Sequence, residues 1–198
     1  VRQFDRAIAD LEKAGSLIAG VPDEIEPDGL PNARNTPTST SHSNIWYHLG
    51  LAYYLTGDFG NALRAYRECL TFSKNSDMLV ATSHWLYMIL RRLDRPEDAA
   101  KVLDPIRPNL DIIENGSYHR LLLMYKGLIP PDVIMEKASA GFELVTSGYG
   151  VGNWHLYNGR RDAAVAIFRK ILQSDQWAPF GYIAAEADLK RLNEPPGA

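Results

Sequence analysis

The sequence contains a single cysteine, Cys69, among its 198 residues. One thiol excludes a disulfide framework and a cluster of cysteine metal ligands. It does not distinguish a cytoplasmic from a periplasmic protein, because proteins of both compartments occur without disulfides. The sequence also has no apolar run near the roughly 18 residues that a membrane-spanning helix requires, so we expect no membrane insertion.

Basic residues are not in excess either. The formal net charge is -3 and the isoelectric point is near 6.0, which excludes the general attraction for phosphates that nucleic-acid-binding domains show. We therefore expect no nucleic-acid partner. Hydrophobic residues make up 45% of the chain, enough to bury a core in a chain of this length.

The motifs of common enzyme classes are missing. The sequence has no G-x-S-x-G elbow and no P-loop, and the glycines of GYGVGN (148–153) fall in a predicted helix rather than after a strand. A metal site needs clustered ligands. The histidines are instead scattered, at His42, His48, His84, His119 and His155. Cys69 falls on the packed side of a predicted helix, so we expect no catalytic residue, no metal and no cofactor.

The stretch 44–70, NIWYHLGLAYYLTGDFGNALRAYRECL, is the most regular part of the chain and predicts two helices joined by a turn at Gly57 and Asp58. One face of the first helix carries residues three or four positions apart, namely Trp46, Leu49, Gly50 and Tyr53. The second helix repeats this spacing with Ala62, Tyr66 and Cys69.

The order Trp, two residues, Leu-Gly, two residues, Tyr, followed by Ala62 and Tyr66, resembles the tetratricopeptide repeat. The resemblance implies an all-α fold in which antiparallel helical hairpins stack into a right-handed superhelix. It also implies that the first helices of the hairpins line a concave surface, from which ligand contacts usually come. Such a repeat indicates that a partner is bound without naming it.

Three further hairpins are predicted after the first. The second spans 78–106, with Pro96 near the start of its second helix. The third pairs a helix at 117–128 with a partner helix at 132–145, in a region (108–148) where we expect an irregular repeat. The fourth spans 149–172, where Gly152 takes the place of Gly50 and Phe168 that of Tyr66. A last helix at 177–192 is predicted to cap the stack through an apolar stripe of Phe180, Ile183, Ala184 and Ala187.

The predicted array therefore spans 44–192, and three other segments surround it. Residues 1–19 resemble the second helix of a half repeat, which suggests a piece of a longer protein. Residues 193–198 are predicted to be a disordered tail. Residues 20–43 form a long loop rich in Pro, Ser and Thr, for which two interpretations fit: a solvated linker, or a segment that folds over the groove. Ser41 or Ser43 is the predicted N-cap of the helix that carries Trp46.

The alignment of the hairpins predicts a ligand groove on the first helices. Three rows of side chains are expected along it: Tyr47, His84, His119 and Tyr149; Leu51, Met88, Leu123 and Asn153; Tyr54, Arg91 and Lys126. Aromatic and imidazole rings provide stacking, Met provides adaptable apolar contact, and the two cations attract a carboxylate or phosphate. Ordinary amphipathic helix surface is the alternative explanation of the same residues.

We therefore expect a non-catalytic module that binds a protein or peptide partner in this groove. Two alternatives stay open: an accessory domain of a longer enzyme, or a groove that binds a small anionic metabolite through Arg91 and Lys126. Association of two copies through the half repeat at 1–19 would give a homodimer.

Overall fold

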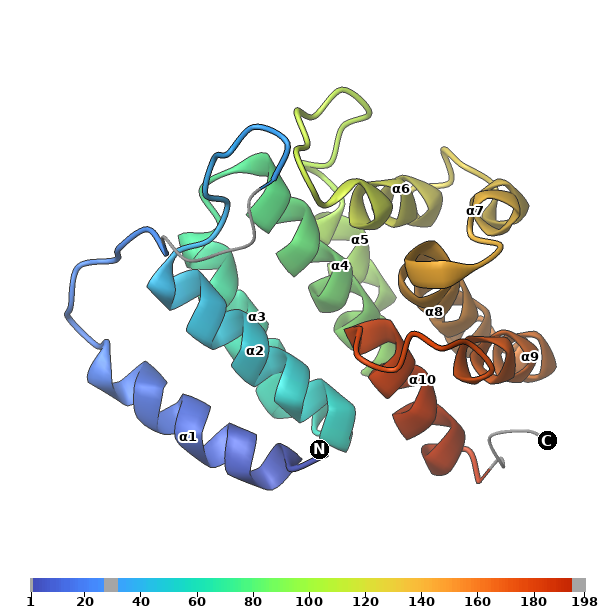
Figure 1. The fold of residues 1–198 in the computed structure, drawn as a ribbon, viewed down its shortest axis with the longest axis horizontal. Coiled ribbons are helices and arrows are strands. Elements are labelled where there is room, and N and C mark those ends of the chain that lie inside the picture. The colour runs from blue at the N-terminus through green and yellow to red at the C-terminus, as the bar shows by residue number, and fades with distance from the viewer. Residues whose placement is uncertain (1, 27–31, 194–198) are drawn as a thin grey trace. The chain divides into compact units, whose positions relative to one another are not determined.

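The computed structural model describes residues 2–26 and 32–193. This part of the chain is all-α, as predicted (Figure 1). Its helices are Phe4–Leu17 (α1), Ser41–Thr56 (α2), Phe59–Phe72 (α3), Ser76–Arg92 (α4), Pro96–Val102 (α5), Gly116–Tyr125 (α6), Pro131–Lys137 (α7), Gly141–Tyr157 (α8), Arg161–Leu172 (α9) and Phe180–Arg191 (α10). None of these helices is both long and apolar enough to cross a membrane. Most of the predicted tail at 193–198 lies outside the described residues.

The chain divides into two compact units, Val1–Gly116 and Ser117–Ala198. In the first unit, α2 packs between α1 and α3, α3 also contacts α4, and α4 contacts α5. Consecutive helices here run antiparallel, as α1, α2 and α3 show in Figure 1. Helix α4 is buried over most of its length, which explains why its sequence is apolar on nearly every side.

In the second unit, α8 is the central helix and packs against α7, α9 and α10. The approach of α10 to α8 depends on Gly181, because a Cβ at this position would lie 2.2 Å from the backbone oxygen of Val145. Asp188 of α10 is fully buried, accepts a hydrogen bond of 2.8 Å from the Tyr149 hydroxyl and pairs with Arg191 at 2.6 Å. A glycine contact and a buried carboxylate therefore attach the last helix to α8.

Two helix predictions for this unit are wrong. The expected partner helix at 132–145 is divided, because α7 ends at Lys137 and Ala140 is extended with φ -156° and ψ 173° before α8 begins at Gly141. The expected buried stripe of the last helix is also out of phase. Its buried residues are Gly181, Ala184, Ala185, Asp188 and Leu189, so only Ala184 of the predicted stripe is fully packed.

Candidate functional site

The N-terminal half of α2 is the best-formed first-helix surface of the first unit. Its N-cap is Thr40, so the prediction of Ser41 or Ser43 is wrong. The Thr40 hydroxyl accepts from the Ser43 backbone N–H at 3.2 Å, and the Ser43 hydroxyl accepts from the Thr40 N–H at 2.8 Å. Serine at the third position thus completes a reciprocal capping box of the kind more often made by Glu or Gln. The cap fixes where α2 begins and therefore which side chains face outward.

The signature residues of 44–70 hold α2 against both neighbours. Trp46 packs on α1 beside Gly15, where an added Cβ would lie 3.1 Å from the indole. The Tyr53 hydroxyl donates a hydrogen bond to Glu12 of α1. On the α3 side, a Cβ at Gly50 would lie 2.5 Å from the ring of Tyr66. The small residue therefore permits close approach of α2 and α3, as the spacing predicts.

Two rings of α2 lie at the surface between these contacts. Tyr47 and His48 are half-buried and meet edge to face, with ring centroids 5.6 Å apart. The Tyr47 hydroxyl accepts a 2.8 Å hydrogen bond from the indole N–H of Trp85 in α4. The His48 Nδ1 lies 2.9 Å from the backbone oxygen of Asn44, and because a carbonyl oxygen accepts, Nδ1 is the donor in this contact. Both rings are thus held in one orientation.

The other groove residues predicted in this unit are mostly packed inside it. Leu51, Tyr54 and Met88 are almost fully buried, and the Tyr54 ring meets that of Trp85 edge to face at 5.0 Å. His84 is 1% exposed, and this burial lowers its pKa to about 3, so the imidazole is neutral. Arg91 is half-buried and lies 3.4 Å from the Tyr87 hydroxyl. Tyr47 and Arg91 are the members of this set with surface available to a ligand.

The second unit holds the remaining predicted groove residues. His119, Leu123, Tyr149 and Asn153 are buried there, and Lys126 is exposed. Tyr149 stacks on Phe168 with ring centroids 5.6 Å apart and uses its hydroxyl for Asp188. In this unit the side chain of the predicted set with an exposed surface is the cation Lys126.

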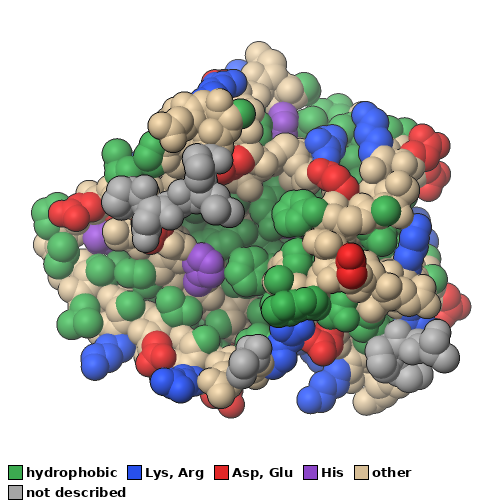
Figure 2. All heavy atoms as spheres, viewed as in Figure 1, with side chains coloured by type: hydrophobic (Ala, Val, Ile, Leu, Met, Phe, Trp, Pro, Cys, Tyr) green, Lys and Arg blue, Asp and Glu red, His purple; other side chains and the backbone are tan. Residues whose placement is uncertain are grey.

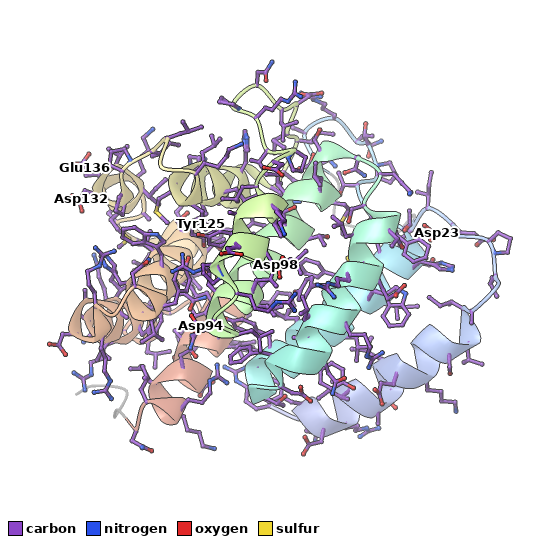
Figure 3. All side chains as sticks on the ribbon, turned by 180° about the vertical axis from the view of Figure 1, so that it is seen from behind. Asp23, Asp94, Asp98, Tyr125, Asp132 and Glu136 are labelled. Atoms are coloured by element: carbon purple, nitrogen blue, oxygen red, sulfur yellow. The ribbon has the colours of Figure 1, made fainter. Side chains whose placement is uncertain are left out.

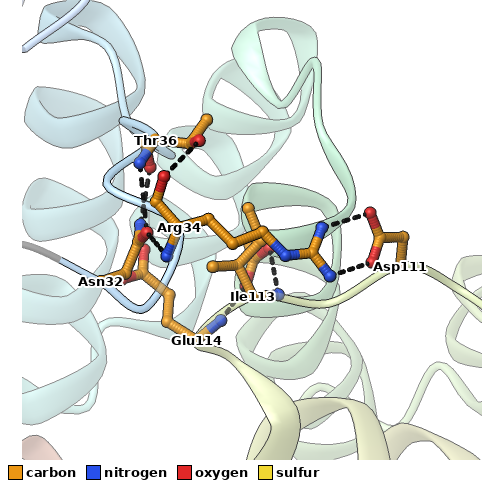
Figure 4. A network of polar contacts seen from close by, with 7 residues as sticks. Asn32, Arg34, Thr36, Asp111, Ile113 and Glu114 are labelled. Atoms are coloured by element: carbon orange, nitrogen blue, oxygen red, sulfur yellow. Dashed lines mark hydrogen bonds and ion pairs between the residues drawn. The ribbon is translucent and has the colours of Figure 1, made fainter.

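The described part of the loop between α1 and α2 is attached to other loops of the first unit (Figure 4). The Arg34 guanidinium makes a bidentate pair with Asp111, at 2.6 and 2.7 Å. The Thr38 hydroxyl donates to Glu114, and the Thr38 backbone oxygen accepts from the side-chain amide of Asn75 at 2.7 Å. Residues 32–40 are therefore tied to the segment before α6.

That segment is itself fixed by a carboxylate that the sequence did not single out. Asp77 in the first turn of α4 is 2% exposed and accepts hydrogen bonds from the backbone N–H groups of Ile113, Glu114 and Asn115, at 2.8 to 2.9 Å. In the second unit, the buried carboxylate of Asp188 was likewise not singled out from the sequence. Neither position carries a motif, because the Asp77 partners and the Asp188 partner Tyr149 lie on other elements and are set by tertiary packing.

Within residues 2–26 and 32–193, no group of three or more His, Cys, Asp or Glu side chains is placed to hold a metal ion. Cys69 is buried as predicted, and this burial raises the pKa of its thiol to about 11. A pocket of about 340 Å³ lies at the turn between α4 and α5, beside Asp94 and Asp98 (Figure 3). Arg95 and Lys101 pair with Asp98, at 2.5 and 3.1 Å, so its charge is already balanced.

Comparison with known proteins gives one result. Residues 43–76 match the family model described as the tetratricopeptide repeat, which confirms the resemblance on the α2–α3 hairpin. No curated protein and no solved structure matches the chain. The matched range covers α2 from Ser43 onward, the contact between Gly50 and Tyr66 and the turn into α4. The chain is therefore similar to the tetratricopeptide repeat over residues 43–76.

Proposed function

We propose that the chain is a non-catalytic module that binds an extended peptide or partner segment on the α2 face of its first unit. The observation that carries the proposal is the pair of oriented, half-buried rings, Tyr47 and His48, within the tetratricopeptide repeat. This repeat generally serves protein interaction, and its first helix is where this chain presents rings at the surface. The partner itself is a matter for experiment.

The chemistry of this face suits a peptide that carries acidic groups. A tyrosine hydroxyl that accepts a hydrogen bond from Trp85 can also donate one to a carbonyl or carboxylate. The half-buried guanidinium of Arg91 adds a cation on the neighbouring first helix, α4. Guanidinium groups bind carboxylates in a bidentate manner, which adds orientation to attraction. A peptide with Asp, Glu or a free carboxyl terminus is therefore the preferred ligand.

The buried members of the predicted rows support this face. Leu51, Tyr54 and Met88 of the same helices are almost fully buried, and close packing leaves little freedom for the backbone of α2 and α4. Rings that are already oriented lose little conformational entropy when a ligand docks, so more of the contact energy appears as affinity. The proposal thus assigns recognition to Tyr47, His48 and Arg91, and support to the residues below.

The test is selection of peptides from a random display library on the immobilised protein, followed by titration of the enriched sequences. We expect acidic sequences to be enriched. We also expect His48→Ala combined with Arg91→Ala to weaken their binding by roughly tenfold, the equivalent of about 1.4 kcal/mol. Arg67→Ala is the matched control, because Arg67 is an exposed cation on α3.

The outcome against the proposal is equally definite. If the selected peptides bind the His48→Ala, Arg91→Ala protein as tightly as the parent, the α2 face is not the binding surface. His84 is unsuitable for this purpose, because removal of a buried ring creates a cavity and lowers stability whether or not the ring meets a ligand. The melting curves of the His48→Ala, Arg91→Ala protein and of Arg67→Ala should match that of the parent.

A further inference from the structure

A second surface of the first unit shows large aliphatic side chains to solvent. Among the described residues, eight large hydrophobic side chains are exposed, and three of them fall within nine positions. These are Leu17, Val21 and Ile25, which are 68%, 51% and 66% exposed. Figure 2 shows hydrophobic side chains along the left margin, over the end of α1 and the segment that follows it. Exposed apolar groups that cluster in this way mark interaction sites more often than scattered ones do.

The backbone that carries these side chains is held in place. Gly20 has φ +78°, a conformation that suits glycine, and turns the chain so that the Val21 N–H bonds to the Ile18 oxygen at 3.0 Å. The Glu24 oxygen then accepts from the Ser41 N–H at 2.9 Å. Ile25 forms an isolated antiparallel bridge with Thr40. The aliphatic side chains are therefore presented by an ordered segment and do not depend on a flexible one.

The same segment is acidic. Asp23 lies at the start of α2 (Figure 3), where it accepts from the His42 N–H at 3.0 Å. Glu26 bonds to the side-chain amide of Asn44, and Glu24 is exposed. The Asp23 carboxylate also lies 2.9 Å from the Nδ1 of His42. Residues 17–26 contain no Lys or Arg, and within the described chain no ion pair joins Glu24 or Glu26 to a Lys or Arg. The apolar side chains thus stand beside carboxylates that no Lys or Arg neutralises.

We infer that Leu17, Val21 and Ile25, called here the aliphatic strip, bind a protein segment that carries aliphatic side chains next to Lys or Arg. Charge complementarity selects this partner, because basic groups beside the apolar contact would pair with Asp23 and Glu24. An anionic membrane surface is the wrong match, since it repels the same carboxylates. The strip lies on other residues than the α2 face and prefers ligands of opposite charge, so this inference goes beyond the proposed function.

The probe for the test is a short synthetic peptide of alternating Leu and Lys, with alternating Leu-Glu and Ser-Lys peptides as comparisons. Fluorescence anisotropy should show that the parent protein binds the Leu-Lys peptide most tightly. Replacement of two exposed aliphatic groups, Leu17→Ser with Ile25→Ser, should weaken this binding by about tenfold or more. Glu24→Lys should weaken it as well and should raise affinity for the Leu-Glu peptide. Leu128→Ser, which removes a 57% exposed leucine of the second unit, is the control and should change nothing.

Several results would overturn the inference. One is a Leu-Lys affinity that is the same in the parent and in the Leu17→Ser, Ile25→Ser protein. Another is sedimentation of the parent as a dimer and of this double variant as a monomer, which would assign the strip to a second copy of the chain. A third is binding of the parent, but not of the variant, to vesicles of zwitterionic lipid. The His48→Ala, Arg91→Ala protein should bind the Leu-Lys peptide normally, so failure of the α2 face and failure of the strip are distinguished.

Discussion

The α2–α3 hairpin of the first unit and the α8–α9 hairpin of the second share one contact and differ in nearly everything around it. In both, a glycine of the first helix touches an aromatic ring of the second. A Cβ at Gly50 would lie 2.5 Å from Tyr66, and a Cβ at Gly152 would lie 2.6 Å from Phe168. The predicted equivalence of the two glycines is thereby confirmed, although the family match covers the first hairpin and not the second.

The outer row of side chains differs in exposure between α2 and α8, the first helices of the two hairpins. Tyr47 is half-buried on α2, whereas Tyr149 on α8 is 1% exposed and bonds to Asp188 of α10. The difference arises because α10 packs on α8 and covers that row. A contact inside a hairpin is thus set by the hairpin's own sequence, while the accessibility of its outer row is set by the next helix.

The largest expected effect comes from replacing each of the two glycines with a larger residue. Gly50→Leu and Gly152→Leu should each lower the free energy of unfolding by about 1 to 3 kcal/mol, because an aromatic ring occupies the space that the new side chain needs. Chemical denaturation of each variant measures the loss.

Gly60→Ala is the control for this pair. Its nearest neighbour would be Asp58 at 3.7 Å, which is ordinary contact, and alanine is the better helix former, so stability should stay or rise slightly. A Gly152→Leu protein as stable as the parent would show that the two hairpins are not packed alike.

Acid should weaken the first unit more than the second. Burial lowers the pKa of His84 to about 3, while an unfolded imidazole keeps its ordinary value of 6.5. As the pH falls below 6.5, the unfolded state therefore takes up a proton that the folded state refuses, and stability is lost. Between about pH 7 and about pH 5 the expected loss is on the order of 2 kcal/mol.

Hydrogen exchange of the α4 and α9 amides at both pH values measures this difference. The half-buried His155 of the second unit has its pKa lowered by burial and by the charge of Arg160, so the direction there is the same. Protection of α4 should nevertheless fall further than that of α9. In His84→Gln the extra acid sensitivity of α4 should disappear, and its persistence would assign the effect to other groups.

The smallest expected effect on stability concerns the N-caps of α2 and α8. Helix α2 has the Thr40 capping box, whereas the N-cap of α8 is Ala140 and makes no side-chain hydrogen bond. Thr40→Ala should cost about 1 kcal/mol, and Ala140→Ser should add about 0.5 to 1 kcal/mol, because the extended backbone of Ala140 already suits an N-cap. Thermal melts of the two variants should shift in opposite directions. A shift of the same sign would mean that the cap is not what distinguishes these helix starts.

Local spacing was enough to predict the all-α fold and the α2–α3 hairpin. Gly50 meets Tyr66 of the next helix, so its role follows from the sequence of the hairpin. Trp46 and Tyr53 instead contact α1, the preceding helix. The start of α8 could not be found in this way. Ala140 does not mark the break, since alanine is itself a strong helix former. The available signal was Gly141, whose φ of +60° suits glycine.

The candidate surface was predicted less well than the fold. The alignment placed Tyr47 and Tyr149 in one row, but burial depends on which helix packs next, and α10 could not be positioned from its own pattern. The phase of α10 depends on Gly181 and Asp188, whose partners Val145 and Tyr149 lie far away in the sequence. The role of Asp77 was not predicted either, because its partners also lie far away in the sequence. The clustering of Leu17, Val21 and Ile25 was also not predicted, because Val21 and Ile25 lie in the predicted loop, where spacing assigns no shared face.

The bidentate pair of Arg34 and Asp111 has a consequence for the rate at which the first unit opens. Its two residues are 77 positions apart, while most helix contacts of this unit join neighbours along the chain. We expect a link across so long a stretch to form after the local contacts. A contact absent from the transition state slows unfolding without speeding folding. Because its side chains are 51% and 73% exposed, loss of this pair should speed unfolding only modestly and leave the folding rate unchanged.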